Sequence, residues 1–280
     1  MRLRDVAGFF DKTLAKDAYN PLTRFLCQLE PFDYVKIDGA SVKRRVMSTV
    51  PGVNIPARGV IDIGGQRYLV GDSSQDHWEG GPVRNRYVLQ GADSLATVTT
   101  IEETLGGTTG TSAYVSVEFN KYATDERDSS TYHPQYHIYF SGSEAVSDGD
   151  IITITAYGIT RYYLVRNANR TMAGLVDALS NHLEDPVIDA AGFSHKTYDP
   201  ITDTYTDASS SVRCLRVRWQ DHFRYLTQSS TSYERGDIQL LVPTSVTPEA
   251  GDTVTLSDGV WRVLSVVSGA GYWSLHMRRS

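Results

Sequence analysis

The spacing of hydrophobic residues predicts helices near the start of the chain. From residue 3 to residue 19, apolar side chains recur every three or four positions with charged residues between them, which is the period of an amphipathic helix. Asn20 and Pro21 interrupt this pattern, because a residue before proline avoids the helical conformation. A second short apolar turn precedes Pro31, so we predict a helical segment over residues 1–30.

After Pro31 the pattern changes to short apolar runs separated by turn residues. Several runs flank glycine-containing turns, which is typical of hairpins. Many short strands with regular turns favour small β-barrel or β-sandwich modules, so we predict a mainly β fold with few helices. The strand candidates are residues 34–37, 42–50, 60–63, 67–70, 87–90, 96–101, 114–119, 136–140, 151–156, 161–165, 212–219, 238–242, 253–256, 261–267 and 272–277.

Two segments depart from this pattern within the β-rich region, which spans residues 31–235. Apolar residues at positions 172, 175, 176 and 179 would share one face of a helix over residues 171–183. Residues 184–211 are polar and predict a long loop or a hairpin extension. The last segment, residues 236–280, predicts a β meander that forms a barrel with strands before it.

Three segments repeat one hairpin pattern, over residues 59–70, 149–165 and 251–263. Each contains a glycine, an aliphatic strand, a glycine turn, an aromatic residue and a second aliphatic strand. The glycines supply turn conformations that other residues resist, and the aromatic residue would pack across the partner strand. The pattern indicates either internal duplication or a feature that β-hairpins share in general. It predicts small barrel-like modules, with one near each end of the chain.

Composition favours contacts with other proteins over binding to nucleic acid. The chain has 280 residues, 17 of them Tyr, and Arg supplies 21 of the 27 basic residues. Tyr and Arg are enriched at interfaces, although a high genomic GC content would also favour Arg over Lys. The formal net charge of −6 argues against a basic nucleic-acid-binding protein. It would suit the lining of a channel through which DNA slides.

The cysteines and the hydropathy pattern indicate a cellular compartment. Cys27 and Cys214 fall in apolar patterns without disulfide or zinc spacing, so we expect two buried free thiols. No apolar run approaches the ~18 residues of a membrane span, and the first residues do not resemble a signal peptide. We therefore expect folding in a reducing cytoplasm and no contact with a membrane.

The sequence predicts no catalytic constellation, metal site or cofactor. His133 and His137 are four residues apart, but Pro134 disfavours the helix that would bring them together. The acidic residues 199–207 lack the turn glycine of a calcium loop, and residues 104–111 lack the Gly-Lys-Ser/Thr ending of a phosphate loop. Paired glycosidase carboxylates from distant parts of the chain stay open as an alternative. We predict a protein that is not an enzyme.

The last hairpin carries a resemblance to a known family. Gly251, Asp252, Gly259, Trp261 and Val263 form a glycine–aspartate, glycine, aromatic and valine pattern. This pattern is similar to a hairpin of tailed-bacteriophage head-closure proteins, also called head–tail connector or stopper proteins. The resemblance covers roughly the last sixth of the chain, and the family members are much shorter than this protein. It implies a small β-barrel that forms a ring beneath the portal and adaptor proteins, with a loop that retains packaged DNA.

The resemblance leads to a functional hypothesis. We expect a ring-forming structural subunit of the virion neck that joins the portal region to the tail and is assembled in the host cytoplasm. Its expected partners are copies of itself, the portal or adaptor protein, a tail protein and, transiently, genomic DNA. Candidate subunit contacts are Phe9, Phe10 and Leu14 on the predicted helix, and Arg216 and Arg218 on one strand face. The alternatives are a tail-completion, baseplate or head-decoration protein, and a carbohydrate-binding or hydrolytic β protein.

Overall fold

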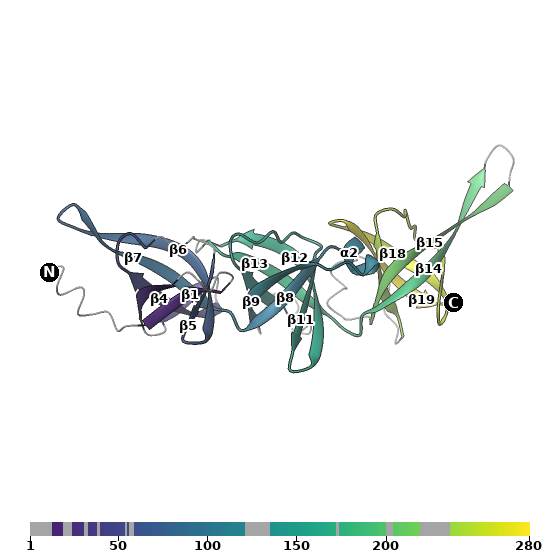
Figure 1. Cartoon of the computed structure of the whole chain (residues 1–280). Coiled ribbons are helices and arrows are strands. Elements are labelled where there is room, and N and C mark those ends of the chain that lie inside the picture. The colour runs from purple at the N-terminus through teal and green to yellow at the C-terminus, as the bar shows by residue number, and fades with distance from the viewer. Residues whose placement is uncertain are drawn as a thin grey trace.

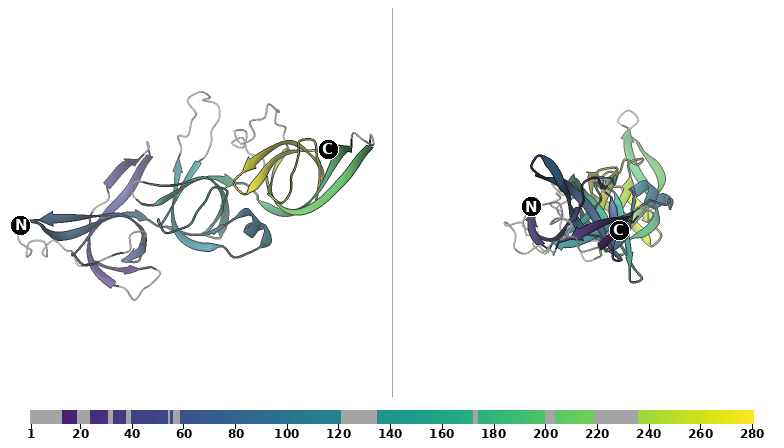
Figure 2. Two further views of the ribbon diagram at one scale, coloured as in Figure 1. Left: turned by 90° about the horizontal axis from the view of Figure 1, so that it is seen from above. Right: turned by 60° about the vertical axis from the view of Figure 1, so that its left-hand side comes forward.

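The computed structural model shows an elongated row of three β modules, which run from the start of the chain to its end (Figure 1). Figure 2 shows the three curled sheets side by side. The predicted mainly β fold with small barrels is therefore confirmed. The structure describes residues 13–18, 24–30, 33–37, 40–53, 55, 59–120, 135–171, 174–199, 204–218 and 236–280.

The first module is a curled sheet of seven strands. The strands are β1 (Thr13–Asp17), β2 (Arg24–Leu29), β3 (Asp33–Ile37), β4 (Ala40–Thr49), β5 (Val60–Ile63), β6 (Gln66–Trp78) and β7 (Gly81–Gly91). They pair in the order β2-β1-β5-β6-β7-β4-β3, and β2 also pairs with β4. The pairing of β4 with β2 curls the sheet back on itself.

The second and third modules are closed six-stranded antiparallel barrels. The second contains β8 (Ser94–Thr99), the helix α2 (Ile101–Gly106), β9 (Thr111–Asn120), β10 (Gln135–Phe140), β11 (Ile151–Ala156), β12 (Ile159–Arg170) and β13 (Val176–Leu183). The third contains β14 (Val187–Asp199), β15 (Thr204–Arg218), β16 (Ile238–Pro243), β17 (Thr253–Leu256), β18 (Gly259–Gly269) and β19 (Tyr272–Arg279). Their pairing orders are β10-β13-β12-β11-β8-β9 and β14-β15-β16-β19-β18-β17.

All three modules pair their strands in the same cyclic order. Around each barrel the strands follow as first, second, third, sixth, fifth and fourth along the chain, and the last pairs with the first. The first module follows the same circuit once β3, which adds to the edge of β4, is set aside. A shared order of this kind favours internal duplication over a chance likeness of three hairpins.

The repeated hairpin occupies the same place in every module, as β5–β6, β11–β12 and β17–β18. Its aromatic residue packs across the partner strand as the sequence predicted, with Tyr68 opposite Ile61 and Trp261 opposite Val254. In all three modules the register shifts immediately after the valine that follows, as a β-bulge does. The inward residues are Ile61, Ile63, Tyr68 and Val70, then Ile152, Ile154, Tyr163 and Val165, then Val254, Leu256, Trp261 and Val263.

An apolar joint fixes the first module to the second. Its buried cluster combines side chains of β5, β6, β10 and the segments between strands, namely Val60, Leu69, Ala92, Tyr139 and Leu175. Gly174 lies so close to the first module that a Cβ would be 2.4 Å from Oδ1 of Asp72. The two modules are therefore in tight contact across this joint.

A second apolar joint fixes the second module to the third. Helix α2 lies in it, and the Arg213 guanidinium of β15 donates a hydrogen bond from Nη1 to the C=O of Leu105 (2.9 Å). A Cβ on Gly149 would lie 2.1 Å from the carbonyl oxygen of Ala270, so the backbones also meet closely. The cluster contains Ile101, Leu105, Ile151, Leu164, Leu183, Leu215, Val217, Leu241 and Tyr272.

Both predicted helices are wrong where the structure describes them. In the segment 1–30, Thr13–Asp17 and Arg24–Leu29 are strands β1 and β2. In the segment 171–183, Val176–Leu183 is strand β13, which places Val176 and Ala178 in the barrel core between β10 and β12. Short apolar runs fit both periods, and pairing with neighbouring strands decided the outcome.

Within the polar segment 184–211, the described residues 187–199 and 204–211 form a hairpin extension rather than a loop, since they pair as β14 and β15. The sequence had left both alternatives open. Helix α2 was not predicted, because Ile101 was assigned to a strand. Thr100 caps this helix in a reciprocal pair with Glu103, which is a recognisable start signal. The predicted boundaries after residues 30 and 235 fall inside modules.

Candidate functional site

The hairpin that carries the family resemblance closes a tight loop in front of β17. Gly251 has a φ of 102°, which favours glycine, and its N–H donates to the C=O of Val263 (2.8 Å). The Asp252 carboxylate accepts a hydrogen bond from the N–H of Glu249 (2.8 Å). The backbone C=O of Asp252 accepts another from the N–H of Val263 (2.9 Å). Gly251, Asp252 and Val263 therefore hold the loop in shape.

The second module builds the same loop from its own residues. The N–H of Gly149 donates to the C=O of Val165 (2.9 Å), and Val165 donates back to Asp150 (2.9 Å). The Asp150 carboxylate accepts from the N–H of Ser147 (2.8 Å), as Asp252 does from Glu249. The glycine–aspartate pair is thus a structural device that the chain uses twice.

Gly259 and Trp261 lie at the turn of the same hairpin. Trp261 is buried in the barrel core, and its indole N–H donates to Oδ1 of Asp258 (3.1 Å). A Cβ on Gly259 would lie 3.3 Å from Nη2 of Arg279, which donates to the C=O of Asp258 (2.9 Å). All five hairpin residues predicted from the resemblance therefore lie together, in structural roles.

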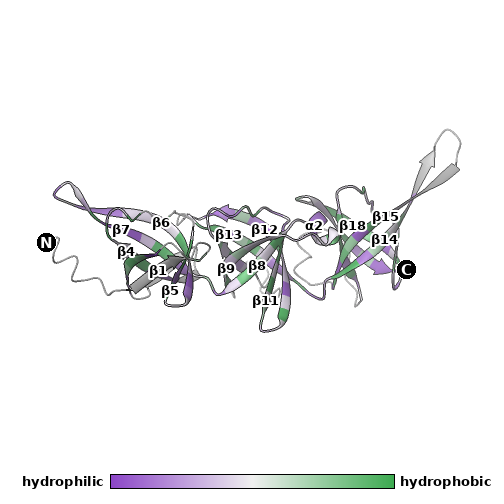
Figure 3. Cartoon of the chain, viewed as in Figure 1, coloured by the Kyte–Doolittle hydropathy of each residue, from purple (hydrophilic) through white to green (hydrophobic). Residues whose placement is uncertain are grey.

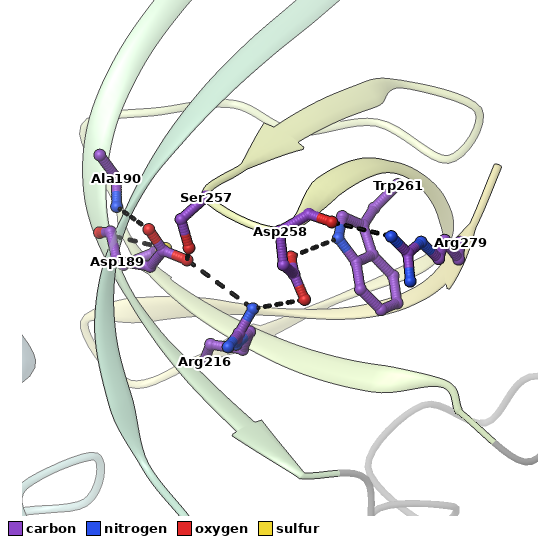
Figure 4. A network of polar contacts seen from close by, with 8 residues as sticks. Asp189, Ala190, Arg216, Ser257, Asp258, Trp261 and Arg279 are labelled. Atoms are coloured by element: carbon purple, nitrogen blue, oxygen red, sulfur yellow. Dashed lines mark hydrogen bonds and ion pairs between the residues drawn. The ribbon is translucent and has the colours of Figure 1, made fainter.

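Arg216 belongs to a partly buried charged network of the third module, on the strand face that also carries the core residue Cys214 (Figure 4). Its Nη1 lies 2.9 Å from Oδ2 of Asp258 and 3.8 Å from Oδ2 of Asp189. Burial opposes the charge on Asp189, but hydrogen bonds from Ser257 and Ala190 and the nearby Arg216 lower the pKa of this carboxyl. The Arg216 guanidinium is thus neutralised by its own module.

The other candidate subunit contacts are dispersed. Arg218 follows Arg216 by two residues on β15 and is exposed, and the role of both at a subunit contact stays a prediction. Leu14 lies on strand β1, where its backbone pairs with Leu26, instead of on a helix. Phe9 and Phe10 lie outside the described residues.

His195 links the projecting hairpin β14–β15 to the glycine–aspartate loop. Its Nδ1 lies 2.6 Å from Oδ1 of Asp252, and its Nε2 lies 3.8 Å from Oε2 of Glu249. The hydrogen bond to Asp252 raises the pKa of His195. Asp252 therefore has a second task, because it holds the base of the hairpin as well as the loop.

A second histidine–aspartate pair lies inside the third module. Nε2 of His276 donates to Oδ2 of Asp237 (2.7 Å), and Arg278 donates to both oxygens of the same carboxylate (3.0 Å each). The His276 side chain is fully buried, and burial lowers its pKa. A substrate cannot reach this imidazole, so the arrangement fits a structural ion pair better than a catalytic one.

Polar residues at the first joint form a further titratable cluster. The Gln90 amide donates to Oε1 of Glu118 (2.9 Å) and to Oγ of Ser116 (3.2 Å) across the joint. Burial raises the pKa of Glu118. His137 lies beside it with Nδ1 3.0 Å from the Asp177 carboxylate. The hydrogen bonds of Gln90 fix the position of the first module relative to the second.

No group of three or more metal-ligating side chains gathers within the part of the chain that the structure describes. His133 lies outside that part, whereas His137 faces Asp177. No helix among the described residues is long and apolar enough to cross a membrane.

Comparisons with known proteins give no match: no family model, no curated protein and no solved structure resembles this chain significantly. The resemblance of the last hairpin therefore stands on its own residues.

The sequence did not predict the contacts between modules or the contact of His195 with Asp252. The joint residues lie at outward positions of strands, where Ile151 or Leu164 is apolar but not part of a barrel core. An alignment of the three hairpins could have located them. In each hairpin, the outward joint residue comes directly before an inward core residue, as Ile151 comes before Ile152 and Leu164 before Val165. His195 carries no local signal, since its partner Asp252 is 57 residues away.

Proposed function

We propose that this protein is a non-enzymatic structural subunit of a tailed-phage virion. In this proposal it is a ring-forming head–tail connector of the neck that helps to retain packaged DNA. The observation that carries the proposal is the head-closure-like hairpin of the third module, whose inward aliphatic and aromatic positions recur at one place in all three modules. A protein built three times from this unit fits an architectural task.

The shape of the molecule supports the same proposal. The two apolar joints make one continuous body of three modules, and such a body can bridge two neighbouring components. Two hairpins, β6–β7 and β14–β15, extend beyond the barrels at opposite ends of the row (Figure 1). The outer part of β6–β7 is strongly hydrophilic (Figure 3), as expected for an arm that reaches through solvent to another subunit.

Disruption of the gene in the phage or prophage that carries it tests the proposal. We expect DNA-filled heads and separate tails that do not join, and restoration of infectious particles by the chain supplied from a plasmid. Electron microscopy of virions with a tag on this protein should then place the tag at the neck. Fully tailed particles without the protein would sink the proposal. A tag on the baseplate, the tail end or the capsid surface would replace it with one of the other virion modules.

A further inference from the structure

Both joints of the row are built from the same two surfaces. One is the hairpin wall. We define it as two outward residues that pair with each other across the two strands of the repeated hairpin, at the end away from its turn. This pair is Val60 and Leu69 in the first module and Ile151 and Leu164 in the second. All four side chains are buried in a joint with the following module.

The other surface is the receiving wall, which lies on the second, third and sixth strands of the following module. Strand register makes its positions equivalent: Tyr139 pairs with Ser116 in the second module as Leu241 pairs with Leu215 in the third. Leu175 and Tyr272 precede their sixth-strand partners by the same two residues. The receiving wall is Tyr114, Ser116, Tyr139, Ser141 and Leu175 in the second module, and Arg213, Leu215, Leu241, Pro243 and Tyr272 in the third.

The third module does not present a hairpin wall that could continue the row. Thr253 and Arg262 pair with each other at the positions of Ile151 and Leu164, and both are exposed. A polar outer face is how arrays of repeated units end, because it removes the apolar surface that the next unit would cover. The third module therefore lacks the aliphatic pair that forms both joints.

The first module keeps an open receiving wall. Ser48 pairs with Gln28 and Arg86, as Tyr139 pairs with Ser116 and Asp177, so the register is the same. Leu26 and Val50 take the places of Tyr114 and Ser141. They are 54% and 46% exposed, whereas Ser141 is 1% exposed in its joint. Two exposed apolar side chains thus mark this wall, whereas Ser141 and Pro243, at the place of Val50, are both buried in the other modules.

We propose that the receiving wall of the first module docks the outer wall of a β-barrel from another protein. The partner presents an aliphatic pair like Ile151 and Leu164, because the same strands accept such a pair at both joints inside the chain. A second copy of this chain does not fit, since its free hairpin wall carries Thr253 and Arg262. The proposal stands on the joints and is independent of the proposed function.

The double variant T253I/R262L tests the docking surface, because it places the aliphatic pair on the full chain and makes a second copy the probe. In sedimentation equilibrium at rising concentration, we expect Leu26→Asp with Val50→Asp to leave the association state of the natural chain unchanged, because copies of the natural chain do not meet through this wall. The double variant should self-associate, and the further changes Leu26→Asp and Val50→Asp should weaken this association roughly a hundredfold, since each removes a buried apolar contact. Far-ultraviolet circular dichroism and thermal unfolding establish that every variant is folded.

The matched control is Leu95→Asp in the T253I/R262L background, since Leu95 is 51% exposed on β8 and belongs to neither the receiving wall of the first module nor the hairpin wall of the third. It should leave the association unchanged. The proposal fails if the folded double variant stays monomeric, or if Leu95→Asp weakens its association as much as Leu26→Asp with Val50→Asp does. End-to-end association of the natural chain that Leu26→Asp with Val50→Asp abolishes would also overturn it, because the partner would then be a second copy.

Discussion

At the scale of single residues, the two cysteines occupy the same place in the first and third modules. Cys27 precedes Gln28, which pairs with Ser48, and Cys214 precedes Leu215, which pairs with Leu241. Both side chains are fully buried in their barrel cores. The expectation of two buried free thiols is confirmed.

Burial raises the pKa of Cys27 to about 11 and that of Cys214 to about 12. Since the thiolate is the reactive form, we expect neither thiol to react with a disulfide reagent in the folded protein at pH 8. Both should react at once in denaturant. Absorbance of the released reagent measures this, and rapid reaction of the folded chain would contradict the burial of these residues.

His195 should make stability depend on pH. Its pKa is raised in the folded protein, so its contribution is complete below the ordinary value of about 6.5 and is lost as the pH rises through the raised value. We expect His195→Gln to destabilise the protein most at acidic pH and least at alkaline pH. His276 acts in the opposite sense because its pKa is lowered, but it is present in both proteins and cancels.

Denaturant unfolding of the natural chain and of His195→Gln at a series of pH values gives this difference directly. A difference that grows toward alkaline pH would show that the hydrogen bond to Asp252 does not stabilise the charged imidazole. Glu249, the other carboxylate near His195, should contribute less because it lies 3.8 Å from Nε2.

At the scale of elements, the glycine–aspartate loop can be tested twice within one chain. Asp150→Ala removes the acceptor for the N–H of Ser147, and Asp252→Ala removes the acceptor for Glu249 and the partner of His195. We expect Asp150→Ala to lower the free energy of unfolding by about 1–2 kcal/mol, and Asp252→Ala to lower it further.

The excess of Asp252→Ala over Asp150→Ala should disappear when both are measured in a His195→Gln background, as a double-mutant cycle requires. Asp252→Asn, which keeps an oxygen acceptor for the N–H of Glu249, is the milder control. If Asp252→Ala has equal effects with and without His195, the contact between Asp252 and His195 does not contribute to stability.

The sequence predicted the strands and the repeated hairpin well because a two-residue alternation and turn glycines are local signals. It failed on β1, β2 and β13, where apolar spacing such as that of Leu175 and Leu179 also fits a helix, and only the partner strands decide. The hairpin residues from Gly251 to Val263 were located correctly. The contact between His195 and Asp252 joins residues far apart in sequence, and no local pattern encodes it.

At the scale of the whole molecule, the outward residue that follows the repeated aromatic residue on the return strand decides whether a module can form a joint with another. Leu164 is buried in the second joint, while Arg262 at the equivalent place is exposed. We therefore expect Leu164→Arg to open the second joint. Loss of a buried leucine alone costs about 2–5 kcal/mol, and the charge cannot be buried without a partner.

We expect the third module of Leu164→Arg to unfold separately, so that denaturant unfolding shows two transitions, and small-angle X-ray scattering to show a bent ensemble. Ile159→Arg places the same charge at a position that is 58% exposed near the turn of the same hairpin, and it should change neither measurement. An unchanged scattering profile for Leu164→Arg would mean that the short connection, and not the apolar contact, orients the modules.

The connections between modules have a mechanical consequence. Ala92 and Asp93 alone separate β7 from β8, and the segment from Glu184 to Pro186 separates β13 from β14. Two or three extended residues span only about 7–10 Å, so the chain holds almost no slack at either joint. When the row is pulled along its length, the short connection therefore takes up the tension as soon as the joint contacts separate. A joint that yields becomes a hinge, and the modules on either side stay within reach of each other and can dock again.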